Sequence, residues 1–477
     1  MKKKYVRWTL WTIASPFILF IILCILIYLP PIQNFLVDKA AVYASEATGM
    51  NISVGRISLS FPLNLVVTNV DAASPHNDTL LSVRRLQVNV QLLPLLKKQV
   101  EVDGISLQGA TVNSNDLIHG MKLNGTLGEL FISSHGVALD PETAIVNKVL
   151  LKDTDLSLCL NDTAAADTAA SDTTYWKIIL QDIDLQNVSF ALDMPLDSLS
   201  LAASLDNAIL RDGLIDLHKS AYSLQTFRIK NGRVRYDSGK PLAADSLPSG
   251  LDPSHIALTD IGVKLDSLYY GGRNMKAIIS QFVLKERSGV EIVSATGRMV
   301  SNDKVLRVPS LKLETRDSYL ELNAAMDWNA LDFKDEGLVS ARLMADIGKP
   351  DVVRFMGSMD EKFIRQYPSE PLRIRTGIDG DLNKLKLTTL TAELPGALGL
   401  FARGELTHLT DSLLRGGDIT LEAETKDLKF VSTLAEGIEI PYGTRLEGKF
   451  TMAGTKMGTD LLLMQPEAQA VVAADTI

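Results

Sequence analysis

From Asn51 onward, hydrophobic and polar residues alternate with a period of two. Runs such as Leu86-Gln-Val-Asn-Val and Ile105-Ser-Leu repeat this pattern, and Gly, Asn, Asp or Pro residues separate them. Alternation places every second side chain on one face, which is typical of strands in an antiparallel sheet with one apolar and one polar face. The pattern therefore predicts a mainly β protein with few short helices.

One pair of runs predicts a particular hairpin. Leu311 and Leu313 alternate with polar residues, and so do Leu320 and Leu322 beyond a short turn at 316–318. The two runs should pair across this turn, with the four leucines on the same apolar face.

Longer units recur along the chain. Leu306, Val308 and Leu311 match Leu385, Leu387 and Leu390 in order and spacing. Degenerate repetition of this kind is typical of a solenoid-like stack, in which each unit contacts only its neighbours.

Helical and loop signals are few after residue 50. The best helix candidate is Asp351–Gln366, with Pro350 as its initiator and Val352, Phe355, Met359 and Phe363 on one face. A shorter candidate is Asp427–Glu436. Two segments read as loops: 161–174, which is low in complexity and has no large apolar residue, and 237–254, which is rich in Ser, Pro, Gly and Asp.

The segment 8–30 predicts a transmembrane anchor. It is apolar and uncharged over nearly its whole length, and about 20 such residues cross a ~30 Å hydrocarbon core. The basic tip 1–7 precedes it, which places the N-terminus in the cytoplasm and the remainder outside. Its aromatic anchor candidates are Trp8, Trp11, Phe17, Phe20 and Tyr28.

A cleavable signal peptide is the alternative for this segment. Its apolar core would be shorter and would end in a small-x-small cleavage site. The run ends instead in Tyr28, Leu29, Pro30 and Pro31, which favours an uncleaved anchor.

The segment 31–49 predicts an amphipathic helix just outside the membrane. Apolar residues recur at helical spacing from Ile32 to Ala47, and Gly49 is a plausible stop. The helix could lie on the lipid surface or cap the following domain, and the second is favoured. The predicted organisation is a cytoplasmic tip (1–7), a transmembrane anchor (8–30), an amphipathic helix (31–49), an N-terminal β region (50–160), a flexible loop (161–174) and an elongated repetitive β region (175–477).

Composition narrows the function. The 477 residues include 48 Lys and Arg against 57 Asp and Glu, a net charge of -9, which argues against a nucleic-acid partner. Hydrophobic residues make up 46%, so wholesale disorder is excluded. Of the two cysteines, Cys24 lies in the apolar run, which excludes a disulfide framework.

Catalytic and metal-binding motifs are missing from the sequence. The six histidines are not at metal-ligand spacings, and no G-x-S-x-G, Walker A or G-x-G-x-x-G motif occurs. Carboxylate pairs such as Asp182 and Asp184 fit the solvated face of a strand. The sequence therefore predicts a protein that is not an enzyme and needs no cofactor or metal.

The aliphatic strand positions are the remaining candidate site. Leu, Ile and Val make an apolar surface without polar recognition groups, which suits an acyl chain if the face is open. An ordinary closed β core is an equally good interpretation of the composition. The candidate groove residues are Ile105, Leu107, Ile183, Leu185, Phe190, Leu192, Val308, Leu311, Leu313, Leu320, Leu322, Leu385, Leu387, Ile419 and Leu421.

The order of features in residues 1–112 resembles the N-terminus of the AsmA-like family, which includes AsmA and TamB. The resembling elements are the basic tip, the single span, the short helix ending at Gly49, and the segments 51–70, 86–90 and 102–112. The succession is specific although each piece is weak, and the later repeats are similar to the middle sections of TamB-type proteins.

The resemblance implies an elongated, arched, taco-like antiparallel sheet with a hydrophobic groove. It places the protein in the inner membrane of a diderm bacterium, with its bulk in the periplasm. It also implies conduction of phospholipids to the outer membrane, and an outer-membrane Omp85-type partner similar to TamA. The sequence departs from TamB at its end, which predicts a truncated chain or a short member of the family.

A second hypothesis is a scaffold or chaperone for outer-membrane protein insertion. An open sheet edge can add a strand from a client protein through main-chain hydrogen bonds. The two hypotheses differ in which surface acts: the apolar face in a conduit, and the sheet edge in a scaffold.

Overall fold

A computed structural model describes residues 39, 41–42, 45–46, 49–60, 64–74, 79–90, 102–114, 120–138, 142–161, 175–239, 250–334, 337–357, 360–433, 441–465 and 468–476. The predicted anchor 8–30 and most of the loop 161–174 lie outside these residues. Within them, no helix is both long and apolar enough to cross a membrane. Most of the predicted helix 31–49 also lies outside them; Ser45 and Glu46 are helical, and the N–H of Gly49 donates to the Ser45 carbonyl at 2.9 Å.

The chain divides into two compact units, Met1–Asp212 and Gly213–Ile477, which are described separately. The strands of unit 1 are β1 (Asn51–Ser60), β2 (Asn64–Ala73), β3 (Thr79–Val90), β4 (Val102–Asn113), β5 (Met121–Ala138), β6 (Thr143–Leu160) and β7 (Lys177–Met194). They are followed by the 3-10 turn η1 (Pro195–Asp197) and by β8 (Leu199–Asp216), whose last residues belong to unit 2.

Unit 1 is an antiparallel sheet with one parallel pair. Consecutive strands from β1 to β6 pair antiparallel, whereas β6 and β7 run parallel, with Thr143 opposite Lys177. A parallel pair needs a crossover connection, because the chain must return to the starting end of the sheet. The segment predicted as a flexible loop, 161–174, is part of that crossover.

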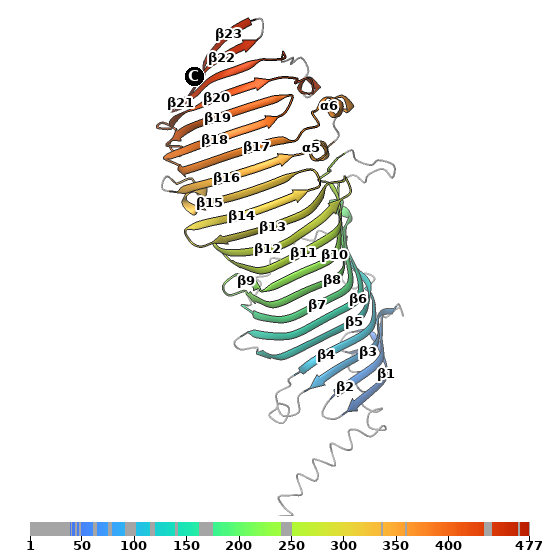
Figure 1. The fold of residues 1–477 in the computed structure, drawn as a ribbon. Helices are drawn as coiled ribbons and strands as arrows, with labels where there is room; N and C mark the ends of the chain where they lie inside the picture. Colours follow the sequence, from blue (N-terminus) through green and yellow to red (C-terminus); the bar gives the residue numbers. More distant parts are fainter. Residues whose placement is uncertain are drawn as a thin grey trace, which may run out of the picture. The chain divides into compact units, whose positions relative to one another are not determined.

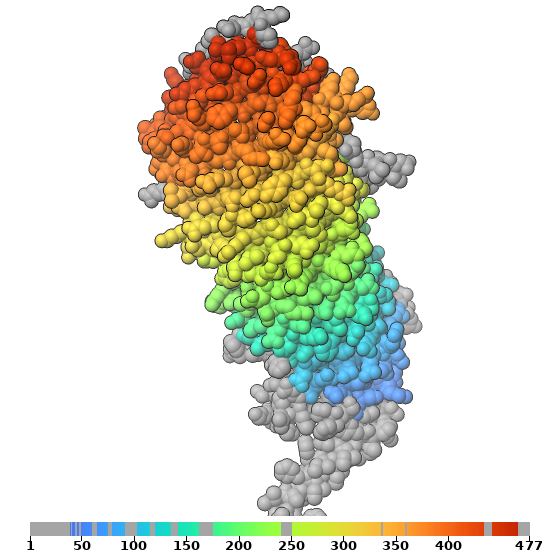
Figure 2. Space-filling model, viewed as in Figure 1, coloured from blue at the N-terminus to red at the C-terminus, as the bar shows by residue number. Residues whose placement is uncertain are grey.

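The strands of unit 2 are β9 (Ala221–Leu224), β10 (Thr226–Ser238), β11 (His255–Gly271), β12 (Asn274–Glu286), β13 (Glu291–Ser301), β14 (Val305–Thr315), β15 (Tyr319–Asp327), β16 (Leu338–Ile347), β17 (Leu372–Asp381), β18 (Lys384–Leu394), β19 (Leu398–Thr407), β20 (Gly416–Thr425), β21 (Arg445–Ala453), β22 (Lys456–Gln465) and β23 (Ala468–Thr476). From β10 onward they follow one another side by side in chain order, and each neighbouring pair is antiparallel (Figure 1). The colours of unit 2 in the space-filling view follow the same order (Figure 2).

The predicted hairpin is confirmed. Leu311 lies opposite Leu322 and Leu313 opposite Leu320, in the pair β14–β15. The mainly β, largely antiparallel class is confirmed with it.

The predicted repeat corresponds to two bulged strands. The register shifts between Val308 and Leu311 in β14, and between Leu387 and Leu390 in β18. An extra residue at a β-bulge keeps the apolar positions on one face despite their spacing of three. The matching residues therefore occupy equivalent places in equivalent strands.

Both helix predictions need correction. The segment predicted as one helix forms two short ones, α5 (Lys349–Phe355) and α6 (Glu361–Gln366), and Gly357 adopts a positive φ between them. Phe363 is buried but Phe355 is 54% exposed, so the supposed apolar face is split. In the described part of Asp427–Glu436 only the 3-10 turn η2 (Val431–Thr433) is helical.

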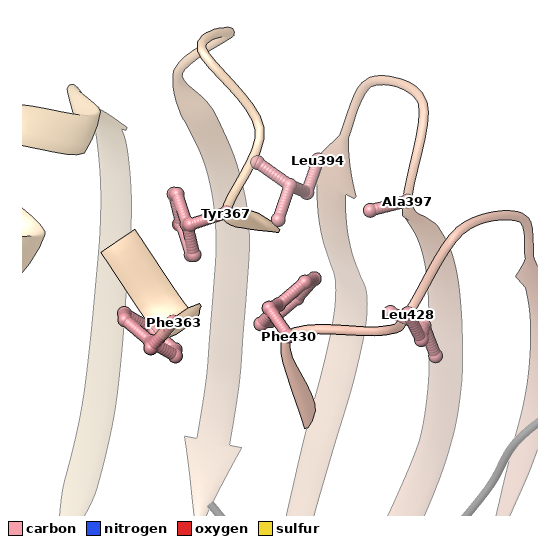
Figure 3. Packing of buried hydrophobic residues seen from close by; sticks show 6 residues of the cluster. All are labelled: Phe363, Tyr367, Leu394, Ala397, Leu428 and Phe430. Atoms are coloured by element: carbon pink, nitrogen blue, oxygen red, sulfur yellow. The ribbon is translucent and has the colours of Figure 1, made fainter. Parts of the chain in front are cut away.

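The two longest connections of unit 2 contribute aromatic residues to a buried hydrophobic cluster. Phe363 and Tyr367 from the β16–β17 connection contact Phe430 from the β20–β21 connection, with ring centroids 5.1–5.8 Å apart (Figure 3). Leu394 and Ala397, at the β18–β19 turn, complete the cluster with Leu428. This cluster therefore lies at the ends of the strands.

Candidate functional site

The strand register of unit 1 aligns aliphatic residues into rows. Directly opposite residues of neighbouring strands share a face and lie side by side. Two rows cross all seven strands from β1 to β7. The first contains Leu59, Leu65, Val88, Ile105, Ile132, Val149 and Ile183, and the second contains Ile57, Val67, Leu86, Leu107, Leu130, Leu151 and Leu185.

Polar residues occupy the row directly next to the second aliphatic row. It contains Arg56, Thr68, Arg85, Gln108, Glu129, Lys152 and Gln186. Since neighbouring residues of a strand point to opposite faces, one face of unit 1 is apolar and the other is mainly polar. The row between the two aliphatic rows also adds Val66, Phe131 and Leu150 to this mainly polar face, which we call the polar face. The candidates Phe190 and Leu192 extend the apolar face at the far end of β7, where they lie opposite Leu156 and Leu158.

Unit 2 has apolar rows of the same kind. One runs through Ile229, Val263, Phe282, Ala295, Leu313, Leu320, Ala345, Ile374, Ala392, Leu400, Ala423, Leu446 and Leu463. The next contains Leu311, Leu322, Leu343, Leu390, Ala402 and Leu421, with the polar Thr376 between Leu343 and Leu390. Val308, Leu387 and Ile419 lie in a third row and Leu385 in a fourth.

All fifteen candidate residues therefore lie in apolar rows, and none of them is fully buried. Thirteen are partly buried, while Ile105 and Phe190 are 37% and 38% exposed. A leucine between two packed layers would lose nearly all its accessible surface, since interiors are close-packed. The larger side chains of the rows thus keep part of their surface exposed, whereas the small Ala295, Ala345 and Ala402 between them are buried. We call the face that carries these rows the apolar face of each unit.

The polar face carries surface ion pairs and hydrogen-bonded charged groups. Lys285 Nζ lies 2.8 Å from Asp260 Oδ2, and this hydrogen bond lowers the pKa of Asp260 and raises that of Lys285. A hydrogen bond from the Tyr319 hydroxyl to Glu321 raises the pKa of Tyr319. Exposed pairs of this kind contribute little to stability, about 0–1 kcal/mol each. They explain why this face carries charged residues, and such surface pairs are not evidence of a catalytic site.

Titratable groups elsewhere are engaged with their neighbours. Asp182 forms an ion pair with Arg211, and Asp184 accepts a hydrogen bond from Asn207 Nδ2 at 3.2 Å. His255 Nδ1 lies 2.9 Å from Asp252 Oδ2, and this hydrogen bond lowers the pKa of Asp252. In the part of the chain that the structure describes, no three His, Cys, Asp or Glu side chains are grouped so that they could hold a metal.

The candidate residues predicted from the sequence include only two of the seven residues in each row of unit 1, and two of those in the first row of unit 2. Leu130 and Ile132 in β5, and Val149 and Leu151 in β6, sit in runs where apolar residues also occupy intervening positions, such as Phe131. The alanines of unit 2 were missed because a small side chain gives little hydrophobic signal. The row pattern became visible only when the register was known.

The comparisons with known proteins found no match from which a function could be assigned. No protein-family model matches the chain. No curated protein matches it either.

Proposed function

We propose that the chain is a lipid conduit that shields acyl chains on its apolar face. The observation that carries the proposal is the alignment of partly exposed aliphatic residues into continuous rows across neighbouring strands. An acyl chain lying on such rows would cover apolar surface that otherwise contacts water, and each Å² so covered contributes about 25 cal/mol.

The composition of the rows supports a lipid over a more polar ligand. The side chains are mainly Leu, Ile, Val and Ala, with few aromatic rings and no cluster of hydrogen-bonding groups among them. Sites for small polar molecules place a few convergent polar groups in the pocket to fix orientation. A uniform aliphatic track fixes no orientation, and it suits a ligand that slides.

The predicted anchor and the resemblance to AsmA-like proteins support a location for the conduit. Together they support a protein held in the inner membrane that conducts phospholipids between the inner and outer membranes, with an Omp85-type partner at the outer membrane. These elements lie mainly outside the described residues, so their support comes from the sequence.

Site-specific photo-crosslinking tests the conduit. Crosslinkers at Leu107, Leu185, Leu322 and Leu421 should capture phospholipid in membranes of a diderm host. Matched crosslinkers on the polar face, at the neighbouring residues Gln108, Gln186, Glu321 and Glu422, should not. Equal capture on both faces would refute the proposal. Capture of outer-membrane protein clients, with no phospholipid at either set, would favour the scaffold hypothesis.

A further inference from the structure

The ladder of unit 1 is interrupted along one line that crosses seven strands. Bridges form on both sides of this line in the same register, so no residue is inserted or lost, but the residues on the line itself are not paired in the ladder. These residues, which we call the crease, are Gly55, Asn69, Arg84, Gly109, Gly128, Asp153 and Asn187.

The residue types of the crease fit an unusual backbone. Asn69, Gly109, Asp153 and Asn187 have φ between +49° and +63°. Gly, Asn and Asp are the residues that tolerate this left-handed region, whereas β-branched residues are strained there. An added Cβ on Gly128 would lie 2.8 Å from the Cβ of Asp153. The crease is therefore both conformationally special and tightly packed.

The alternation of apolar residues changes phase at the crease. Apolar residues on either side are three positions apart instead of two, as in Val67 and Val70, or Leu107 and Ala110. A regular strand would send these two side chains to opposite faces. The same shift in neighbouring strands keeps one face apolar across the whole sheet.

Burial identifies the apolar face as the concave one. Next to the crease on this face lie Val83, Ala110 and Thr154, which are 5%, 9% and 2% exposed. On the polar side of the crease Arg56, Arg85, Gln108 and Lys152 are all exposed. Residues at the bottom of a bend are crowded by both flanks, and those on its outside are spread apart.

The length of the crossover independently requires a bend in β6. The backbone N–H of Asn161 donates to the Gly120 carbonyl, and that of Tyr175 donates to Glu142, so both ends of the crossover are fixed. Fourteen residue steps from Asn161 to Tyr175 reach at most about 50 Å. A straight strand from Glu142 to Asn161 would be about 63 Å long.

We infer that the crease bends the sheet of unit 1 toward its apolar face and thereby sets the width of the groove that holds an acyl chain. The inference rests on the proposed function for the identity of the ligand, but not for the bend. The crease residues are positioning residues: they shape the apolar face without belonging to it.

Spin labels on β5 test the bend directly. Labels at Asn124 and Ser133 lie on opposite flanks, with Gly128 between them, and both native cysteines are first replaced by serine. In a straight strand these nine residue steps would span about 30 Å. The wild-type protein should give a shorter distance by pulsed electron resonance. A wild-type distance at the straight-strand value would overturn the inference whatever the variants do.

Two substitutions at Gly109, on the neighbouring strand, add side chains of similar size that differ in how well they tolerate a positive φ. They separate the effect of backbone conformation from the effect of added side-chain volume. Gly109→Asn tolerates the left-handed backbone and should keep the short distance, whereas Gly109→Val should lengthen it. Val and Asn variants with the same short distance would refute the role of the crease. If Gly109→Val fails to fold, the label distances in the wild type and in Gly109→Asn still decide whether the sheet bends at the crease.

A crosslinker at Leu107, with vesicles of phosphatidylethanolamine and phosphatidylglycerol, tests the link to function. Capture of phospholipid should be kept in Gly109→Asn and lost in Gly109→Val. Undiminished capture in a Gly109→Val protein whose label distance has lengthened would overturn the link between bend and groove. A bent wild-type sheet that captures no phospholipid would overturn the proposed function and leave the bend established.

Discussion

The substitution Leu313→Asp distinguishes an open apolar face from a sealed core. Leu313 is partly buried and lies between Ala295 on one neighbouring strand and Leu320 on the other. In a sealed core, an unpaired carboxylate would cost several kcal/mol and its pKa would rise. On an open face, water continues to reach the carboxylate, so this penalty is absent.

The expected cost on the open face follows from the burial of the leucine. Full burial of a leucine side chain contributes about 1.5–3 kcal/mol, and a partly buried one loses roughly half of that. The free energy of unfolding should therefore fall by about 0.8–1.5 kcal/mol, which is a factor of about 4–13 in the ratio of folded to unfolded protein. The protein should still accumulate, but a charge in the row should abolish passage of acyl chains.

Urea unfolding and phospholipid capture at Leu421 measure the two effects. The control is Thr296→Asp, which puts the same charge on the polar face opposite Lys312. It should leave both stability and capture near wild type. A loss of more than about 4 kcal/mol in Leu313→Asp, or its degradation, would show a sealed core and refute the open face, since costs of that size mark buried defects.

Three further predictions concern the parts that hold the sheet together. Phe363→Ala should lower the free energy of unfolding by about 3–5 kcal/mol because the ring is 2% exposed, whereas Phe355→Ala, at a ring 54% exposed, should change it by less than about 0.5 kcal/mol, as urea unfolding would show. Burial raises the pKa of Glu286, but hydrogen bonds from the backbone N–H groups of Ala257 and Ser288 outweigh it, so the folded pKa lies below the unfolded value of about 4.3. The carboxylate then stabilises the fold above that pH and loses its effect as the pH falls through the folded pKa, so Glu286→Gln should be less stable than wild type at pH 7 and equal to it in acid; a difference that persists in acid would contradict this account. Deleting residues 164–168 would leave nine steps in the crossover, a reach of about 32 Å, and should expose β7 to protease, whereas inserting five residues there should be tolerated.

The strands could be predicted from the sequence because their signal is local. Alternation identifies each strand and one apolar face, and a short turn is enough to pair β14 with β15. The phase shifts were equally visible, as in Val54 and Ile57, but a single strand cannot show that its shift aligns with those of its neighbours. The crease is defined by how the strands align with one another, so it could not be predicted from the sequence of any single strand.

The remaining differences have non-local causes. The aromatic cluster joins Phe363 and Tyr367 to Phe430, which lie in two connections separated by four strands. A helical pattern over Asp351–Gln366 was favoured by local spacing, but contacts of Phe363 with the distant connection stabilise a broken helix instead. The parallel pair of β6 and β7 likewise depends on where the chain returns, which alternation does not encode.

In this fold, the residues that contribute most to stability differ from those that form the proposed binding face. A sheet normally buries its apolar face against a second layer, and that layer is then the main source of stability. Here the most deeply buried large side chain of the described residues, Phe363, lies at the strand ends, and the leucines of the rows are only partly covered, although three of the alanines between them are buried. The connections and the hydrogen-bonded ladder can then hold each unit while the face stays free to bind. Substitutions at the strand ends should therefore destabilise the protein, and substitutions in the rows should mainly impair its activity.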